Sequence, residues 1–210
     1  MNVWILAAAA AVVLLLLVFG LRRAAVHRRQ RQAGKAGEER VEAILREWVR
    51  KRRGWQLVAR DCRGPYSARC ILLLPPGSPA PQEVDHLLVG PAGVVAVETK
   101  NYGGTIQVLS DAVWRRSRGG GRARRTESPT AQVRRHASVL RALLPGVPVH
   151  SLICIANDGA VLRGRRRSDV PIVTAAELPA YLDRLARQKA LAPRAVDAAL
   201  QAIEAAKKRR

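Results

Sequence analysis

The residues with the clearest capacity for chemistry lie in the stretch V-E-T-K-N-Y-G-G, residues 97–104. It places a carboxylate, Glu98, and an ammonium, Lys100, two positions apart, after a run of β-branched apolar residues. In a β-strand, side chains two residues apart share one face, so the two charges would lie side by side where the strand ends. Such a pair fits either an exposed ion pair or half of a site that cleaves phosphodiester bonds.

Two apolar runs and the short segment between them would position this pair: E-V-D-H-L-L-V (83–89), G-P-A-G (90–93) and V-V-A-V-E-T-K (94–100). The pattern predicts a β-hairpin with a four-residue loop. We take Val89 and Val94 as the pair that flanks the loop. Counting back along the strands then places Asp85 opposite Glu98, with Cβ atoms ~4.5–5.5 Å apart. Lys100 shares the face on which the two carboxylates meet.

Two carboxylates that face each other destabilise a sheet unless something compensates their charge. A divalent cation does so, since hard cations take carboxylate oxygens and Mg²⁺ is bound through one or two of them. Asp85 and Glu98 are therefore candidate ligands of Mg²⁺ or Mn²⁺. Lys100 would position or deprotonate a water, or neutralise developing charge. The alternative is a solvated cluster of charges at a sheet edge, and the spacing alone leaves both interpretations open.

Further segments with regular periodicity surround this hairpin. Helical spacing or a helix-start signal is found at 36–49, at 128–144, where Ser128 caps the helix and Pro129 begins it, and at 193–206. Strand composition is found at 55–61, 68–74, 105–109 and 149–156, and 171–186 contains a short strand followed by a helix. The order of these elements predicts a mixed α/β or α+β domain with one sheet covered by helices.

The charge balance indicates a polyanionic partner. Thirty-seven Lys and Arg residues against 16 Asp and Glu give a formal net charge of +21, which suits nucleic acid or an anionic membrane. The segment 115–125 is predicted to be a mobile loop that clamps a phosphate backbone, or else a solvated insertion; its arginines are Arg115, Arg116, Arg118, Arg122, Arg124 and Arg125. The three cysteines have no C-x-x-C spacing, which argues against a zinc site or a disulfide framework and favours a reducing compartment.

The N-terminal residues have the composition of a membrane anchor. Residues 3–21 contain no charged side chain, and a basic stretch, predicted to be a juxtamembrane linker, follows at 22–35. This pattern predicts one transmembrane helix, with the N-terminus outside and the C-terminal domain cytoplasmic. A cleaved signal peptide is the rival interpretation, but the basic n-region typical of such a peptide is missing.

Several segments resemble the nuclease-related domain (NERD) family, within the PD-(D/E)xK phosphodiesterase superfamily. They are G-E-E-R-V-E-A-I-L (37–45), the block 83–106, Trp114 and S-P-T-A-Q-V-R-R-H-A-S-V-L (128–140). The resemblance implies a central mixed sheet flanked by helices, with a restriction-endonuclease-like core. It also implies a site made of Glu38, Asp85, Glu98, Lys100 and Gln132. Ser128 stands where the family has asparagine, a tolerable exchange at a helix cap.

Two histidines accompany these residues. His86 follows Asp85 in the chain and therefore alternates to the opposite face of the strand, where we expect it to be packed. His136 lies one turn after Gln132, where it would face either the site or, as we expect, the surface.

The sequence thus predicts a membrane-anchored, Mg²⁺-dependent nuclease domain over residues 36–190, followed by a C-terminal helix and basic tail over 191–210. DNA is the expected substrate, RNA the less favoured one, and little sequence specificity is expected because no zinc finger or helix-turn-helix is evident. The alternative is a catalytically inactive module that binds nucleic acid or acts as a scaffold at the membrane.

Overall fold

The computed structural model describes residues 3–59, 71–74, 81–117, 119, 121–188 and 190–207, without the side chains of residues 3–13 and 27. Two compact units are distinguished, Met1–Ala36 and Gly37–Arg210. Helix α1 (Val3–Arg50) runs through both units: its residues up to Ala36 belong to the first, and its residues from Gly37 on belong to the second. The residues predicted as a basic linker, 22–35, lie inside this helix, and the predicted helix over 36–49 is its last part.

The prediction of a membrane anchor is corrected. Within the residues that the structure describes, no helix is both long and apolar enough to cross a membrane. The start of the predicted span, residues 3–13, lies outside the described side chains. The predicted single-pass topology is therefore wrong.

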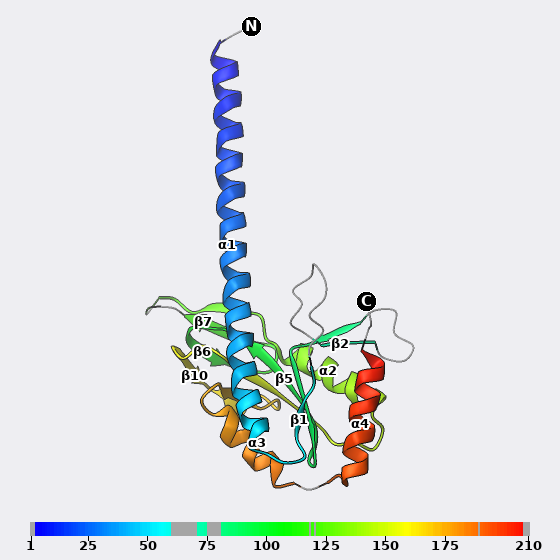
Figure 1. Cartoon of the computed structure of the whole chain (residues 1–210). Helices are drawn as coiled ribbons and strands as arrows, with labels where there is room; N and C mark the ends of the chain where they lie inside the picture. Colours follow the sequence, from blue (N-terminus) through cyan, green and yellow to red (C-terminus); the bar gives the residue numbers. More distant parts are fainter. Residues whose placement is uncertain are drawn as a thin grey trace. The chain divides into compact units, whose positions relative to one another are not determined.

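A five-stranded mixed sheet forms the centre of the second unit (Figure 1). Its strands, in spatial order, are β1 (Gln56–Leu57), β4 (His86–Gly90), β5 (Gly93–Lys100), β9 (Val149–Ile155) and β11 (Ile172–Thr174). β1, β4 and β5 pair antiparallel, whereas β9 runs parallel to both β5 and β11. β5 is the middle strand and is buried on both faces almost to its end, which explains its nearly continuous apolar run.

The β4–β5 hairpin has the predicted register, with Val89 paired to Val94. The ladder continues to a pair between Gly90 and Gly93, so the turn has two residues and not the predicted four. A Cβ on Gly90 would lie 2.2 Å from the ring of Trp55, so only glycine fits there. This close packing of the turn fixes the register that brings the polar end of β5 to its place.

A four-stranded sheet lies beside the central one and contains two segments that were predicted differently (Figure 1). Its strands, in spatial order, are β10 (Ala160–Arg163), β6 (Gly104–Val108), β7 (Trp114–Ser117) and β8 (Arg124–Thr126). The prediction of a mobile loop over 115–125 is therefore wrong at both of its ends, and the strand predicted over 105–109 lies in this second sheet, whereas a single sheet was expected. The reason is Trp114, which is fully buried in a core shared with Val108 and Ile153 and so holds β7 in place.

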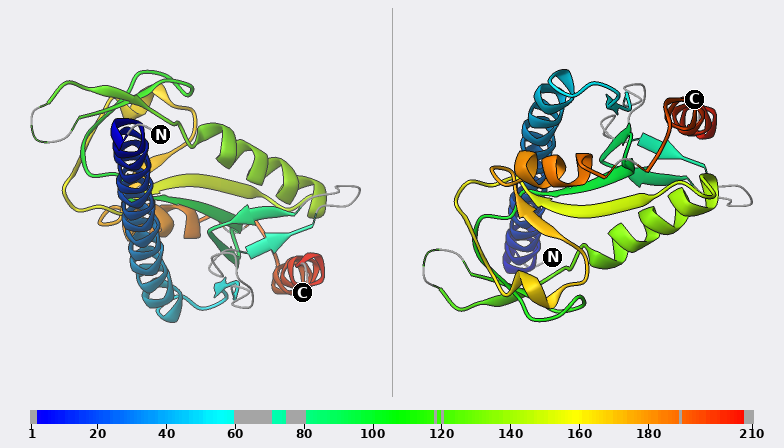
Figure 2. Two further views of the ribbon diagram at one scale, coloured as in Figure 1. Left: turned by 90° about the horizontal axis from the view of Figure 1, so that it is seen from above. Right: turned by 90° about the horizontal axis from the view of Figure 1, so that it is seen from below.

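The remaining elements flank these sheets. They are the strand pair β2 (Ile71–Leu73) and β3 (Gln82–Val84), the helices α2 (Thr130–Leu143), α3 (Leu178–Ala186) and α4 (Pro193–Ala206), and the short 3₁₀ helix η1 (Arg165–Arg167). α3 and the end of α1 pack on the face of β5 that carries Val95 and Val97. α2 and α4 pack on the face that carries Val94 and Ala96. Figure 2 shows α2 and α3 on opposite sides of the strands.

The predicted fold class is thus confirmed as a mixed α/β arrangement of mixed sheets flanked by helices, although the described residues form three sheets and not one. A restriction-endonuclease-like core stays a prediction. Helix α2 begins at Thr130, one residue later than predicted, and the Ser128 hydroxyl accepts a hydrogen bond from the Thr130 backbone N–H at 3.3 Å.

Candidate functional site

The polar end of β5 carries an ion pair that is almost entirely enclosed. The Glu98 side chain is 1% exposed and the Lys100 side chain 25%, and the Lys100 ammonium donates to Glu98 Oε1 at 2.6 Å. The two residues share one face of the strand, two positions apart, because side chains alternate along it. Burial distinguishes this pair from the solvated edge pair that was the alternative interpretation of the sequence.

Helix α2 covers the pair and adds two further side chains from one of its faces. Gln132 Oε1 accepts a hydrogen bond from the Lys100 ammonium at 3.2 Å. His136, one turn later, is 3% exposed, and its Nδ1 lies 3.7 Å from Glu98 Oε2. The expectation of a surface histidine at 136 is therefore wrong, and the signal that could have revealed it is its spacing of four from Gln132.

Asp85 reaches the same place from the neighbouring strand. It lies at a bend between β3 and β4, and its Oδ2 accepts the backbone N–H of Thr99 at 2.7 Å. Regular pairing of β4 begins only at His86, so Asp85 meets β5 through a backbone hydrogen bond and not as a ladder partner of Glu98. His86 itself points to the opposite face, where its Nε2 lies 3.1 Å from the Thr99 hydroxyl, as predicted for a packed histidine.

Glu38 approaches the site from helix α1. The preceding residue, Gly37, is buried, and a Cβ there would lie 2.8 Å from the Cβ of Asn101, directly after the Lys100 position. Helix and strand end are therefore in close contact. The Glu38 carboxylate is near enough to Glu98 to act on its pKa.

The electrostatics of this cluster are dominated by burial. Burial, followed by the charges of Asp85 and Glu38, raises the pKa of Glu98 to about 7, although Lys100 opposes the shift. Burial also acts to lower the pKa of Lys100, but the neighbouring Glu98 and Asp85 carboxylates outweigh it, so this pKa is raised and the group is an ammonium at neutral pH. Burial lowers the pKa of His136 to about 4, so its ring is neutral.

One atom of the cluster bears on a metal ion. Glu98 Oε2 is buried and has no hydrogen-bond partner among the described residues. Such an oxygen is costly unless a cation or a proton satisfies it. In the described ranges no group of three or more His, Cys, Asp and Glu side chains has the arrangement of a metal site. Mg²⁺ needs only one or two carboxylates, so the oxygen donors of Glu98 and Asp85 fit it chemically.

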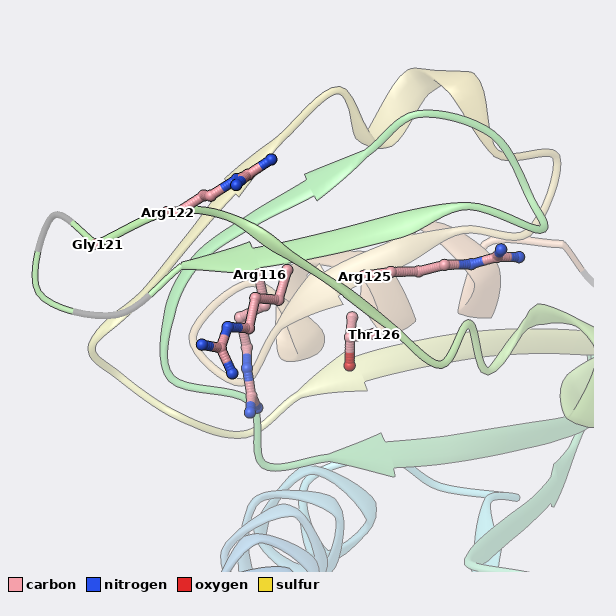
Figure 3. A pocket seen from close by; sticks show the side chains of 6 residues that line it. Arg116, Gly121, Arg122, Arg125 and Thr126 are labelled. Carbon is pink, nitrogen blue, oxygen red and sulfur yellow. The ribbon is translucent and has the colours of Figure 1, made fainter.

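Four of the six predicted nucleic-acid-binding arginines line a hollow of about 480 Å³ at the β7–β8 hairpin (Figure 3). Its lining residues are Arg116, Gly121, Arg122, Arg124, Arg125 and Thr126. Arg115 lies on β7 but does not line the hollow, and the prediction for Arg118 falls outside the described residues. The Arg116 guanidinium lies over the Tyr102 ring, 5.1 Å from its centre, which links the hairpin to the chain just beyond Lys100.

The second unit is thus a mixed α/β domain with an enclosed acid–lysine–amide cluster at the end of a middle strand and an arginine-rich sheet beside it. The family model "Nuclease-related domain" (NERD) matches residues 33–156, more than half of the 210-residue chain, and the chain belongs to this family. The matched region includes every residue of the cluster. The same comparisons find no similar curated protein and no similar solved structure.

Proposed function

We propose that the protein is a nuclease that hydrolyses phosphodiester bonds at the cluster formed by Asp85, Glu98, Lys100 and Gln132, with Glu38 beside it. The observation that carries the proposal is the Lys100 ammonium, which binds Glu98 at 2.6 Å and Gln132 at 3.2 Å in a nearly enclosed position. Membership of a nuclease-related family supports the same reaction class.

A divalent cation, Mg²⁺ or Mn²⁺, is part of this proposal. Asp85 and Glu98 would hold it, and Glu98 Oε2 is an oxygen in need of such a partner. When bound, such a cation would lower the pKa of a coordinated water and stabilise the negative charge that builds up at the phosphoryl group. Because the Glu98 pKa is raised to about 7, cation binding below that pH would displace a proton from the carboxyl group.

Lys100 acts as a positive charge in this scheme. Its raised pKa keeps the ammonium protonated at neutral pH, so it neutralises charge on the phosphoryl oxygens and does not remove a proton from water. A preorganised donor of this kind, in a site shielded from solvent, contributes roughly 10²–10³-fold to the rate. Gln132 accepts a hydrogen bond from the ammonium and thereby fixes the orientation of the ammonium.

The substrate that we propose is nucleic acid, with DNA preferred to RNA and with little sequence specificity. The arginines around the hollow at β7 and β8 would hold its phosphates next to Tyr102, close to the end of β5. Contacts of this kind are sequence-independent and weaken steeply with salt.

The test is cleavage of plasmid and linear DNA by the full chain with Mg²⁺, Mn²⁺ or a chelator. We expect cleavage that needs the cation and is lost in Lys100→Ala, while Lys51→Ala, which removes an exposed lysine paired with Glu47, behaves as the wild type. Cation-dependent cleavage that survives Lys100→Ala would overturn the assignment of the site. DNA binding without any cleavage, together with no heat of Mg²⁺ or Mn²⁺ binding in calorimetry, would favour the inactive binding module.

A further inference from the structure

A line of polar side chains crosses all four strands of the β10–β6–β7–β8 sheet. Arg163 pairs with Gln107, Gln107 with Arg115, and Arg115 with Arg125. Directly paired residues of neighbouring strands point to the same face of a sheet. The four residues, here called the arginine row, therefore form a straight line across one face.

The arginine row occupies the face that does not join the core. Ile106, Val108 and Trp114 alternate with row residues along β6 and β7, and all three are buried. The three arginines of the row are exposed, and Gln107 is half-buried. None of the three guanidinium groups has a carboxylate partner among the described residues. The row and the hollow share Arg125, whereas Arg163, Gln107 and Arg115 do not line the hollow.

The row has an energetic cost that a bound anion would remove. Arg115 and Arg125 are direct cross-strand partners, and like charges in that position destabilise a sheet. Strands are spaced by ~4.8 Å, so the row extends ~14 Å from β10 to β8. A line of three positive charges over that length suits a linear polyanion with several phosphates. Gln107, in the middle, supplies amide donors that also bind phosphate oxygens.

We propose that the arginine row binds the phosphodiester backbone of a nucleic acid and so forms a second contact surface, outside the site of hydrolysis. The choice of nucleic acid as the polyanion rests on the proposed function. The neighbouring line on the same face consists of Val161, Thr105 and Ser117, all uncharged, so on this side of the row the positive charge ends at a single line of residues. A row bounded in this way matches a single phosphate backbone better than a broad anionic membrane surface.

The experiment compares two triple variants of the full chain with equal loss of charge. One removes the row: Arg115→Gln, Arg125→Gln and Arg163→Gln. The control removes three exposed arginines on the helices or their ends: Arg141→Gln, Arg187→Gln and Arg194→Gln. Binding of a fluorescent 30-nucleotide DNA, single-stranded and duplex, is followed by anisotropy in a chelator across a range of salt concentrations, so that no cleavage occurs.

We expect the row variant to lose affinity roughly 100-fold at 0.1 M salt, and the slope of log K against log salt to fall by about 2–3, since each lost phosphate contact contributes ~0.7–0.9 to it. The control variant should stay within a few-fold of the wild type. Equal losses in both variants would overturn the proposal, since net charge alone would then explain the binding. A row variant that loses affinity for vesicles of anionic lipid, while its affinity for DNA is unchanged, would overturn it as well.

A single substitution protects the test against misfolding of the triple variant. Gln107→Glu places a carboxylate between Arg163 and Arg115, which stabilises the sheet as opposite-charge neighbours while cancelling much of the row's charge. We expect unchanged or higher thermal stability and weaker DNA binding, with Gln107→Ala nearer to the wild type. Wild-type affinity in Gln107→Glu would contradict the proposal. Binding is measured without a cation, so a wild type that binds DNA but never hydrolyses it would refute only the nuclease function. Hydrolysis by the wild type, with unchanged DNA binding in the triple variant and in Gln107→Glu, would refute only this inference.

Discussion

The two polar regions of the domain differ in the burial of their charges and in the sign of the neighbouring charge. At the end of β5, Glu98 and Lys100 are opposite charges, enclosed and joined at 2.6 Å. On the four-stranded sheet, Arg115 and Arg125 are like charges, exposed and paired across strands. The charges of the first region have partners inside the protein, whereas Arg115 and Arg125 have no carboxylate partner among the described residues. We infer that the first is built for a reaction and the second for a partner that arrives from solution.

The largest expected effect separates turnover from binding. Lys100→Met removes the ammonium but keeps the shape of the side chain, so we expect kcat to fall by about 10²–10³-fold with little change in KM. Arg115→Gln with Arg125→Gln should raise KM for long DNA and leave kcat nearly unchanged. Steady-state cleavage of a labelled duplex measures both constants. A fall in kcat in the arginine variant, or a rise in KM alone in Lys100→Met, would contradict the assignment of turnover to the enclosed region and of binding to the exposed arginines.

The second prediction concerns pH and the enclosed region alone. Between pH 4.5 and about 7 the folded chain keeps the Glu98 proton that the unfolded chain has lost, so this group makes folding weaker as pH rises. His136 has the opposite sign: between about pH 4 and 6.5 the unfolded chain binds a proton that the folded chain excludes, so this group makes folding stronger as pH rises. The two contributions cancel over most of that range.

Removing either group should therefore reveal the other. In a chelator, the unfolding free energy of Glu98→Gln should rise with pH between pH 5 and 6.5, with a slope about 1.4 kcal/mol per pH unit greater than that of the wild type. His136→Asn should lose a similar amount over the same interval. Urea unfolding at several pH values gives these slopes. Parallel profiles for the wild type and both variants would mean that the two groups titrate normally.

A third effect tests how closely helix α1 must approach the site. Gly37→Ala would put a Cβ 2.8 Å from the Cβ of Asn101, so we expect a loss of about 1–3 kcal/mol in the free energy of unfolding. The displacement of neighbouring Glu38 should also weaken Mg²⁺ binding roughly 10-fold. Gly34→Ala is the matched control, because a Cβ added at Gly34 would meet nothing within 4 Å. It should be neutral, or stabilise the helix by up to about 1 kcal/mol.

Unfolding curves and Mg²⁺ calorimetry on both glycine variants check this prediction. If Gly37→Ala is destabilised but binds Mg²⁺ as tightly as the wild type, Glu38 has no part in holding the cation. If the two variants behave alike, the close approach of the helix to Asn101 does not contribute to the free energy of unfolding.

The enclosed region was largely predictable because its geometry is local. One hairpin register placed Asp85 beside the end of β5, and the spacing of Glu98 and Lys100 placed both on one face. What remained hidden was burial. The spacing of four from Gln132 places His136 on the same face of the helix, but the sequence does not show that this face covers an ion pair, so His136 was expected at the surface.

The arginine-rich region was not predictable from local pattern. Residues 115–125 have the composition of a loop, yet both ends are strands, because Trp114 is buried and β7 pairs with both β6 and β8. The row depends on parallel pairing of β10 with β6, which brings Arg163 level with Gln107. Hydropathy also misled at the N-terminus, where an apolar run predicted a span that the described part of the helix does not contain.

The smallest effect asks whether the like-charge pair really costs stability. Arg125→Gln relieves the charge that faces Arg115, so we expect the free energy of unfolding to rise by roughly 0.2–1 kcal/mol at low salt. Arg163→Gln is its control, because Arg163 faces the uncharged Gln107, and its stability should not change. In 1 M salt, where the Debye length is about 3 Å, the gain for Arg125→Gln should vanish.

Thermal unfolding at low and high salt measures this difference, and anisotropy on the same samples measures DNA binding. If Arg125→Gln is more stable than the wild type and yet binds DNA more weakly, the Arg125 charge contributes to DNA binding and lowers the free energy of unfolding. If Arg125→Gln is instead less stable than Arg163→Gln at low salt, the guanidinium of Arg125 contributes packing within the sheet. The exposed region would then resemble the enclosed one, with charges held in place by the protein itself.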